Sequence, residues 1–243
     1  MFKKIAYIVL AVLLAAYILL SSFFFKDPTG ATVCNKVSIV VVDTLERHFI
    51  SERDVTVMLK NAGLYPQGKA LREIDTEKIE ARLKENKLIK DAQAYKTTGG
   101  TLKVKIYQRI PLMRVIGISD NYYVDTEGKA MPVASQYAAY VPLFSGHITK
   151  EHAQGELFTF ARYLHGNKFW NAQIEQIYVH PNKDLELTPR VGNHQILLGS
   201  LEDFEKKLSN LELFYNQALN KTGWNRYSMI NLKYKNQIVC TRR

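Results

Sequence analysis

The feature that most constrains this chain is an uncharged apolar run near its start, from Ile5 to Phe25, which reads IAYIVLAVLLAAYILLSSFFF. Its length is close to the ~20 apolar residues that a helix needs to cross the hydrocarbon core of a bilayer. In lipid, every backbone N–H and C=O must be paired within the segment, and a helix achieves this. The run therefore predicts a single membrane-spanning helix over residues 5–25.

A cleaved signal peptide is the main alternative. Its apolar region would be only ~7–15 residues long and would lead into a cleavage site of small residues. Here the aromatic and charged residues Phe23 to Lys26 follow instead. Lipid attachment at Cys34 is disfavoured as well, because Ala31-Thr32-Val33 lacks the leucine of a lipobox. We expect the run to remain as an uncleaved anchor.

The charge around the run predicts its orientation. Lys3 and Lys4, together with the terminal amine, outweigh the charge that follows the run. Positively charged flanks stay on the cytoplasmic side of a membrane helix. We therefore expect a cytoplasmic tail of residues 1–4, a linker over residues 26–35, and an exported body behind it.

Composition limits what the exported body can be. A hydrophobic content of 47% and an aromatic content of 11% support a packed core rather than disorder. The net charge of +10 is spread out, so an exported body is expected to meet lipid headgroups or acidic proteins and not nucleic acid. Cys34 and Cys240 are too few for a disulfide framework, and we expect two isolated thiols, with Cys240 packed as a small apolar residue.

The first part of the body reads as a small domain of residues 36–110 with the order strand, helix, helix, strand, strand. Hydrophobic periodicity and capping residues predict its elements. They are a strand Lys36–Val42, a helix Glu52–Ala62, a helix that begins after Asp75 and buries Ile79 and Leu83, and a hairpin of Lys90–Thr97 with Leu102–Tyr107. Pro111 has no amide to give to a central ladder, so we expect the domain to end there.

Residues 111–243 predict a second, β-rich domain, which makes the fold class α+β. Its expected elements are a hairpin turned at Asp125–Lys129, a strand Val141–Gly146, a helix through Leu157 and Leu164, a meander of Ile174–His180, Leu185–Pro189 and His194–Leu198, a long helix opened by Ser200 and Asp203, and a terminal hairpin of Met229–Tyr234 with Gln237–Cys240.

No linear motif for catalysis is present. His147, Glu151 and His152 match neither zinc-protease spacing, and we interpret their segment as a glycine-flanked loop. Asp184 and Glu186 are interpreted as a solvated strand face. We expect no catalytic, metal-binding or cofactor-binding residues and no small-molecule substrate, although a site assembled in space stays open as an alternative.

The terminal hairpin is the more informative feature. A strand at the end of the chain often lies at a sheet edge, where its unpaired N–H and C=O groups accept a strand from a partner. Lys233, Lys235, Arg242 and Arg243 would protect such an edge against indiscriminate pairing. A last strand that is buried or covered by a loop is the alternative.

The order of features resembles the bacterial cell-division family FtsQ/DivIB over nearly the whole chain. Several motifs carry this resemblance. They are Gln108-Arg109-Ile110-Pro111 at the junction after a POTRA domain, the hairpin Tyr122–Lys129, the strand Val141–Gly146, Leu197-Leu198-Gly199 before the long helix, and Ile230-Asn231-Leu232-Lys233-Tyr234 near the end.

The resemblance implies a non-enzymatic scaffold of the divisome, at the inner membrane of the division septum. It would bind FtsB/FtsL-type single-pass partners by strand addition at the C-terminal edge and help control septal peptidoglycan synthesis, with the synthase complex as a further partner. The partner-binding residues that it implies are Tyr234, Lys235, Asn236, Gln237, Ile238, Val239 and Cys240.

The chain departs from the family pattern at two places. Gln108 replaces an acidic residue at the junction, and the last turn is shortened to Lys235-Asn236, without an aromatic near the end of the strand. Two other function classes stay open. One is a POTRA-bearing translocation or assembly factor, and the other is an anchored hydrolase, which a pocket joining His147, His152 and a carboxylate would favour.

Overall fold

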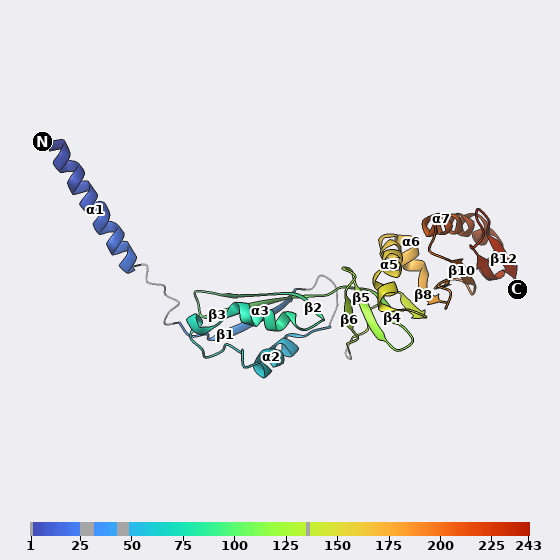
Figure 1. Cartoon of the computed structure of the whole chain (residues 1–243), viewed down its shortest axis with the longest axis horizontal. Coiled ribbons are helices and arrows are strands. Elements are labelled where there is room, and N and C mark those ends of the chain that lie inside the picture. Colours follow the sequence, from blue (N-terminus) through green and yellow to red (C-terminus); the bar gives the residue numbers. More distant parts are fainter. Residues whose placement is uncertain (1, 25–31, 43–48, 135–136) are drawn as a thin grey trace. The chain divides into compact units, whose positions relative to one another are not determined.

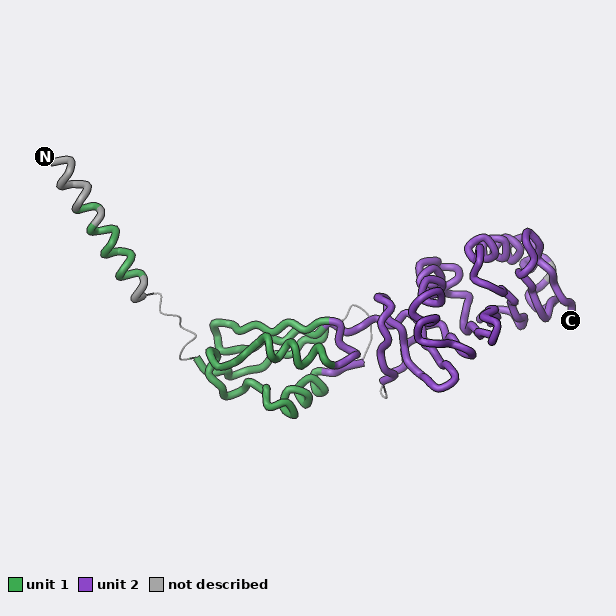
Figure 2. The backbone as a smooth tube through the Cα atoms, viewed as in Figure 1, with its two compact units in different colours: residues 1–42, 52–85, 91–106 green, residues 43–51, 86–90, 107–243 purple. Residues whose placement is uncertain are grey.

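The computed structural model describes residues 2–24, 32–42, 49–134 and 137–243 (Figure 1). The chain divides into two compact units that interleave in sequence (Figure 2). Unit 1 comprises residues 1–42, 52–85 and 91–106, and unit 2 comprises residues 43–51, 86–90 and 107–243.

The apolar run is helical. Helix α1 extends over Phe2–Phe24, and the Ser21 hydroxyl donates to the Ile18 carbonyl at 2.9 Å within it. Among the residues that the structure describes, no helix combines the length and the hydropathy that a membrane crossing requires. The membrane span predicted for residues 5–25 is not confirmed.

Unit 1 has the predicted order of elements. They are β1 (Lys36–Val42), α2 (Glu52–Asn61), a 3-10 turn (Leu71–Glu73), α3 (Thr76–Lys84), β2 (Ile89–Lys96) and β3 (Thr101–Gln108). The strands form a sheet in the order β1-β3-β2. Asp75 caps α3 as expected, because its carboxylate accepts the Lys78 amide at 3.0 Å. Leu59, Leu83 and Val104 are fully buried, so both helices and the central strand contribute to one core.

Unit 2 is built on one large sheet. Over the described residues the sheet has nine strands in the order β12-β11-β10-β9-β8-β7-β4-β5-β6. The strands are β4 (Pro111–Ile116), β5 (Asn121–Asp125), β6 (Ala130–Pro132), β7 (Leu143–Gly146), β8 (Ile174–Val179), β9 (Leu185–Pro189), β10 (Gln195–Gly199), β11 (Tyr227–Asn231) and β12 (Val239–Arg242). The pairs β4–β7, β7–β8 and β10–β11 are parallel, and the other neighbours are antiparallel.

Helices cover one face of this sheet. They are α4 (Lys150–Gln154), α5 (Glu156–Gly166), α6 (Lys168–Gln173), α7 (Phe204–Phe214), a π-helical turn (Tyr215–Leu219) and α8 (Asn220–Thr222). A buried row of cross-strand partners runs along the covered face through Ile230, Ile196, Leu187, Ile177, Phe144 and Val115. It packs into the same cluster as Phe160 of α5, Trp170 of α6 and Leu208 of α7.

Three predictions for unit 2 were wrong in detail. Pro111 was expected to be excluded from a central strand, but it is the first residue of β4, where a missing amide is tolerated, and β4 lies between β5 and β7. The segment of His147 and His152 is not only a loop, because Thr149 caps the short helix α4 through a bond from the His152 amide. The long helix begins at Phe204 and not at Ser200, since Asp203 adopts a left-handed conformation with φ 52°.

The junction motif has a structural role within unit 2. Arg109 donates to the buried Asp125 carboxylate at 2.7 Å, and the other Asp125 oxygen accepts the amides of Glu127 and Lys129. The side-chain oxygen of Gln108 accepts the Ile50 amide at 3.0 Å. An uncharged acceptor thus serves that backbone donor without burying a second carboxylate.

Candidate functional site

The last strand lies at an edge of the large sheet. Among the described residues, β12 is the terminal strand in the sheet order and pairs with β11 alone, with Asn231 opposite Val239 and Ile230 opposite Cys240. The Val239 side chain is 45% exposed, whereas Cys240 packs against the core under the helices. Over the residues that the structure describes, the terminal hairpin presents a strand edge, as expected, and its last strand is not buried.

The hairpin connection is longer than predicted. β11 ends at Asn231 and β12 begins at Val239, so only Val239 and Cys240 of the predicted partner-binding residues lie in a strand. The cause is local. The Asn231 side chain accepts the Lys233 amide at 2.9 Å, which forms an Asx turn and takes the backbone out of the ladder.

The other predicted residues form the connecting segment. Tyr234 is 56% exposed, and the Gln237 amide closes a turn onto its carbonyl. Lys235 and Asn236 lie in that turn, with Asn236 in a left-handed conformation, and Ile238 packs against the core. The structure therefore brings the predicted set together as one loop followed by the start of an edge strand.

The direction of the backbone groups on β12 follows from one bond. The Arg243 amide donates to the Arg226 carbonyl. Successive amides of a strand alternate in direction, so the amides of Thr241 and Val239 face β11. The groups of Cys240 and Arg242 then face away from the sheet and are the ones an added strand would meet.

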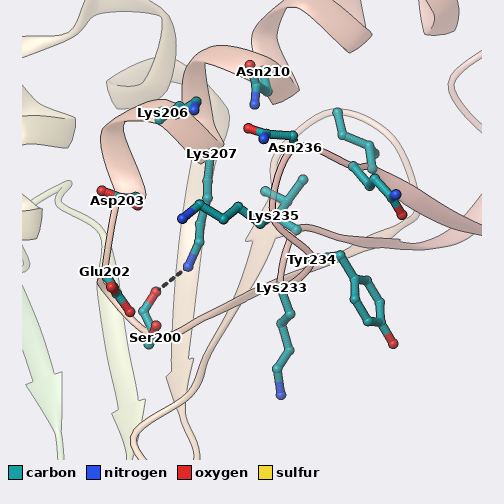
Figure 3. Close-up of a pocket in the computed structure, with 13 residues that line it drawn as sticks. Ser200, Glu202, Asp203, Lys206, Lys207, Asn210, Lys233, Tyr234, Lys235 and Asn236 are labelled. Carbon is teal, nitrogen blue, oxygen red and sulfur yellow. Dashed lines mark hydrogen bonds between the residues drawn. The ribbon is translucent and has the colours of Figure 1, made fainter.

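A groove adjoins this edge. It encloses about 290 Å³ between the connecting segment and the start of α7 (Figure 3). We call it the hairpin groove. Its lining residues are Ser200, Glu202, Asp203, Lys206, Lys207, Asn210 and the continuous run Leu232–Ile238.

Lys233 is held at one side of the groove. Its ammonium pairs with Asp184 at 2.6 Å, and this pairing lowers the pKa of the Asp184 carboxyl from its ordinary value. The stem of Lys233 crosses Gly199, which has a positive φ of 74°, and a Cβ at that glycine would lie 2.7 Å from Lys233 Cγ. Gly199 therefore makes room for the side chain that fixes the connecting segment to the β8–β9 turn.

Lys207 points into the groove from α7. Its Nζ donates to the Ser200 carbonyl at 2.8 Å (Figure 3). It also donates to the Leu198 carbonyl at 3.3 Å. Burial lowers the pKa of this ammonium, an effect that the carboxylates of Glu202 and Asp203 oppose. The hydrogen bonds of the Lys207 ammonium therefore go to neutral carbonyls and not to a carboxylate.

Two of the histidines and carboxylates considered for catalysis make contacts with other charged or titratable side chains. His152 Nε2 lies 3.6 Å from Glu156 Oε2, and burial lowers the pKa of the His152 imidazole. Glu186 lies 3.1 Å from His180, so the carboxylates near the β8–β9 turn are paired and not merely solvated as predicted. Within the described part of the chain, no group of three His, Cys, Asp or Glu side chains could hold a metal ion.

Both cysteines are free thiols, as predicted. Cys34 is buried in unit 1, where its backbone bonds to Lys69 and Gly68. Cys240 is half-buried on β12, and burial raises the pKa of its thiol.

Sequence reasoning missed two parts of the site. Thr241 and Arg242 belong to β12, and the β-branched residues Val239 and Thr241 at alternate positions were the sequence signal for a longer strand. The α7 lysines were not found because no local pattern joins them to the hairpin. They meet it only because β11 returns parallel to β10 after α7.

Comparison with known proteins agrees with this architecture. Residues 110–241 match a family model described as FtsQ/DivIB, C-terminal related, and residues 32–107 match one for a POTRA-like domain. The chain is 27% identical over 196 residues to the cell division protein FtsQ of Rhodothermus marinus, covering 74% of this chain and 70% of that protein.

A solved structure is also similar: the major extracytoplasmic domain of the cell-division protein DivIB from Geobacillus stearothermophilus. It shares 14% identity, covers 47% of this chain and 97% of that domain, and has a TM-score of 0.34. The family models extend over both units, and the FtsQ/DivIB model alone matches more than half of the chain. With an α+β architecture of a POTRA-like unit followed by a β-rich unit, this chain belongs to the FtsQ/DivIB family of cell-division proteins.

Proposed function

We propose that this chain is a non-enzymatic scaffold of the division septum that captures FtsB/FtsL-type single-pass proteins by strand addition at β12. It is anchored in the inner membrane by the apolar run of α1, with its N-terminus cytoplasmic and its body outside. By holding these partners it helps control septal peptidoglycan synthesis. The observation that carries the proposal is the edge position of β12.

Strand addition fits the chemistry of this edge. Each outward N–H and C=O of β12 is a donor or acceptor that a partner strand can pair, while side chains on alternate positions provide specificity. The exposed side chains are Val239, Thr241 and Arg242, a mixture that admits a strand while one charge opposes unselective pairing.

A proline substitution tests the backbone mechanism. Arg242→Pro removes an outward amide and leaves the bonds to β11 in place, so we expect affinity for the FtsB-type partner to fall at least about tenfold. Arg242→Ala keeps the amide and is the matched control, with an expected change below about threefold. Binding is measured by biolayer interferometry with the full chain in detergent. Equal affinity of the proline variant and the wild type would refute strand addition at this edge.

Localisation tests the cellular role separately. A fluorescent fusion at the N-terminus should form a band at midcell in dividing cells and should fractionate with the inner membrane. An even signal around the cell or an outer-membrane signal would instead favour the POTRA-bearing assembly factor, for which the POTRA-like unit 1 is the specific observation.

A further inference from the structure

We infer that the hairpin groove is a selectivity site for a single carboxylate of the partner, from an Asp or Glu in the segment that adjoins the strand added at β12. The inference rests on the proposed function and names the chemistry of the partner at the same edge. Three observations support it: the position of the groove, the bonding of its lysines, and the mixed charge of its lining.

The first observation is continuity with the edge. Leu232–Ile238 form one wall of the groove, and Val239, the next residue, begins β12. A polypeptide that pairs with β12 therefore leads directly past the groove. The occupant can be a continuation of the added strand, and no separate ligand is required.

The second observation is the state of the lysines. Lys233 is engaged by Asp184, so its charge is already compensated. Lys206, Lys207 and Lys235 also line the groove, and over the described residues no carboxylate lies within ion-pair distance of their ammonium groups. Lys207 gives two of its donors to carbonyls, which leaves a third N–H for an incoming acceptor.

The third observation is that the lining is not uniformly basic. Glu202 and Asp203 lie at the α7 side of the groove, away from Tyr234 and Asn236 (Figure 3). They would repel a polyanion such as nucleic acid or polyphosphate. A single carboxylate that meets Lys207 and Lys235 while avoiding these two acids is the better complement, because specificity comes from attraction and repulsion together.

Charge-removing variants of the full chain test the inference with its FtsB-type partner. Lys207→Met keeps the apolar stem and removes the ammonium, and Lys235→Met does the same across the groove. We expect each to weaken binding about three- to tenfold at about 0.15 M salt and to flatten the salt dependence of affinity. Lys207→Arg should keep most of the affinity. Lys221→Met, at the end of the same helical run and outside the groove, is the matched control.

The outcomes separate this inference from the proposed function. Hydrogen exchange of residues 239–242 reports strand addition independently of the groove. If the partner protects these amides in wild type and variants alike, and the methionine variants bind as tightly as wild type with the same salt dependence, the carboxylate site is refuted while strand addition stands. If the partner protects no β12 amide even in the wild type, the proposed function fails. Restoration of Lys207→Glu binding by replacing one partner acid with lysine would identify the carboxylate.

Discussion

His194 shows how strongly one residue's surroundings can limit its protonation. It is 3% exposed, and its Nε2 lies 2.7 Å from the Tyr215 hydroxyl. Gly192 lies against the His194 ring and has a positive φ of 88°. A Cβ at Gly192 would lie 2.7 Å from His194 Cε1. Burial is the main cause that lowers the pKa of this imidazole; the hydrogen bond with the Trp224 backbone opposes it, and the Arg243 guanidinium adds a smaller lowering effect.

A pH dependence of stability follows from this environment. Because the folded-state pKa is below the unfolded value of ~6.5, the unfolded chain binds more protons below that pH. The free energy of unfolding should therefore fall on acidification below pH ~6.5, by at most about 1.4 kcal/mol per pH unit for one such group. His194→Gln should reduce this slope in urea unfolding between about pH 7.5 and 5.5. His152 contributes in the same direction, so part of the slope should persist, and an unchanged slope would contradict the assignment.

The residues of the candidate site could be predicted only in part. Tyr234–Cys240 were identified from the end of the chain and the family resemblance, and they do form one continuous segment beside an edge. The roles of Asp184 and Gly199 could not be predicted. Both residues contact the Lys233 side chain, and this contact joins residues far apart in the sequence, so no local sequence pattern indicates it.

At the scale of elements, patterns of burial and capping predicted most of what the structure shows. β1, α2, α3 and the β2–β3 hairpin have alternating or helical apolar periods, and their ends fall within a few residues of the prediction. β4 was missed because Pro111 was taken as a terminator, although a first strand position needs no amide. α4 and α6 are too short to repeat a helical period, so only their caps, Thr149 and Asn167, could have indicated them.

The hairpin connection yields a prediction at this scale. Asn231→Ala removes the acceptor of the Lys233 amide, and it should destabilise unit 2 by about 0.5–1.5 kcal/mol. It should also increase hydrogen exchange of residues 232–238. Asn231→Asp keeps an oxygen acceptor and is the matched control. Urea unfolding and exchange by mass spectrometry check both effects, and wild-type exchange in the alanine variant would show that the Asx turn does not define the connection.

At the scale of the whole molecule, the order of two units was predictable and their interleaving was not. Residues 43–51 and 86–90 belong to unit 2 although unit 1 surrounds them in sequence. Phe49 explains the first case, because its ring packs edge-on against Tyr123 at 6.0 Å and Tyr137 at 4.8 Å. Such aromatic contacts join residues far apart in the chain and leave no periodic signal.

The two units can be followed separately. Trp170 and Trp224 both lie in unit 2, so tryptophan fluorescence reports that unit, whereas far-UV circular dichroism reports both. Leu83→Ala in the core of unit 1 should cost about 2–5 kcal/mol. We expect it to lower the thermal transition in circular dichroism and to leave the fluorescence transition unchanged. Leu211→Ala in unit 2 is the opposite control, and a joint shift of both signals in the first variant would show that the units unfold together.

The different depths of the two thiols have a practical consequence. Cys34 is buried, while Cys240 on the last strand is half-buried: its side chain packs against the core and its backbone groups are directed away from β11. An unmodified chain thus carries a footprinting probe on the edge strand that we propose as the docking site. The rate at which a small alkylating reagent reacts with the native protein reads out occupancy of that edge without any engineered label.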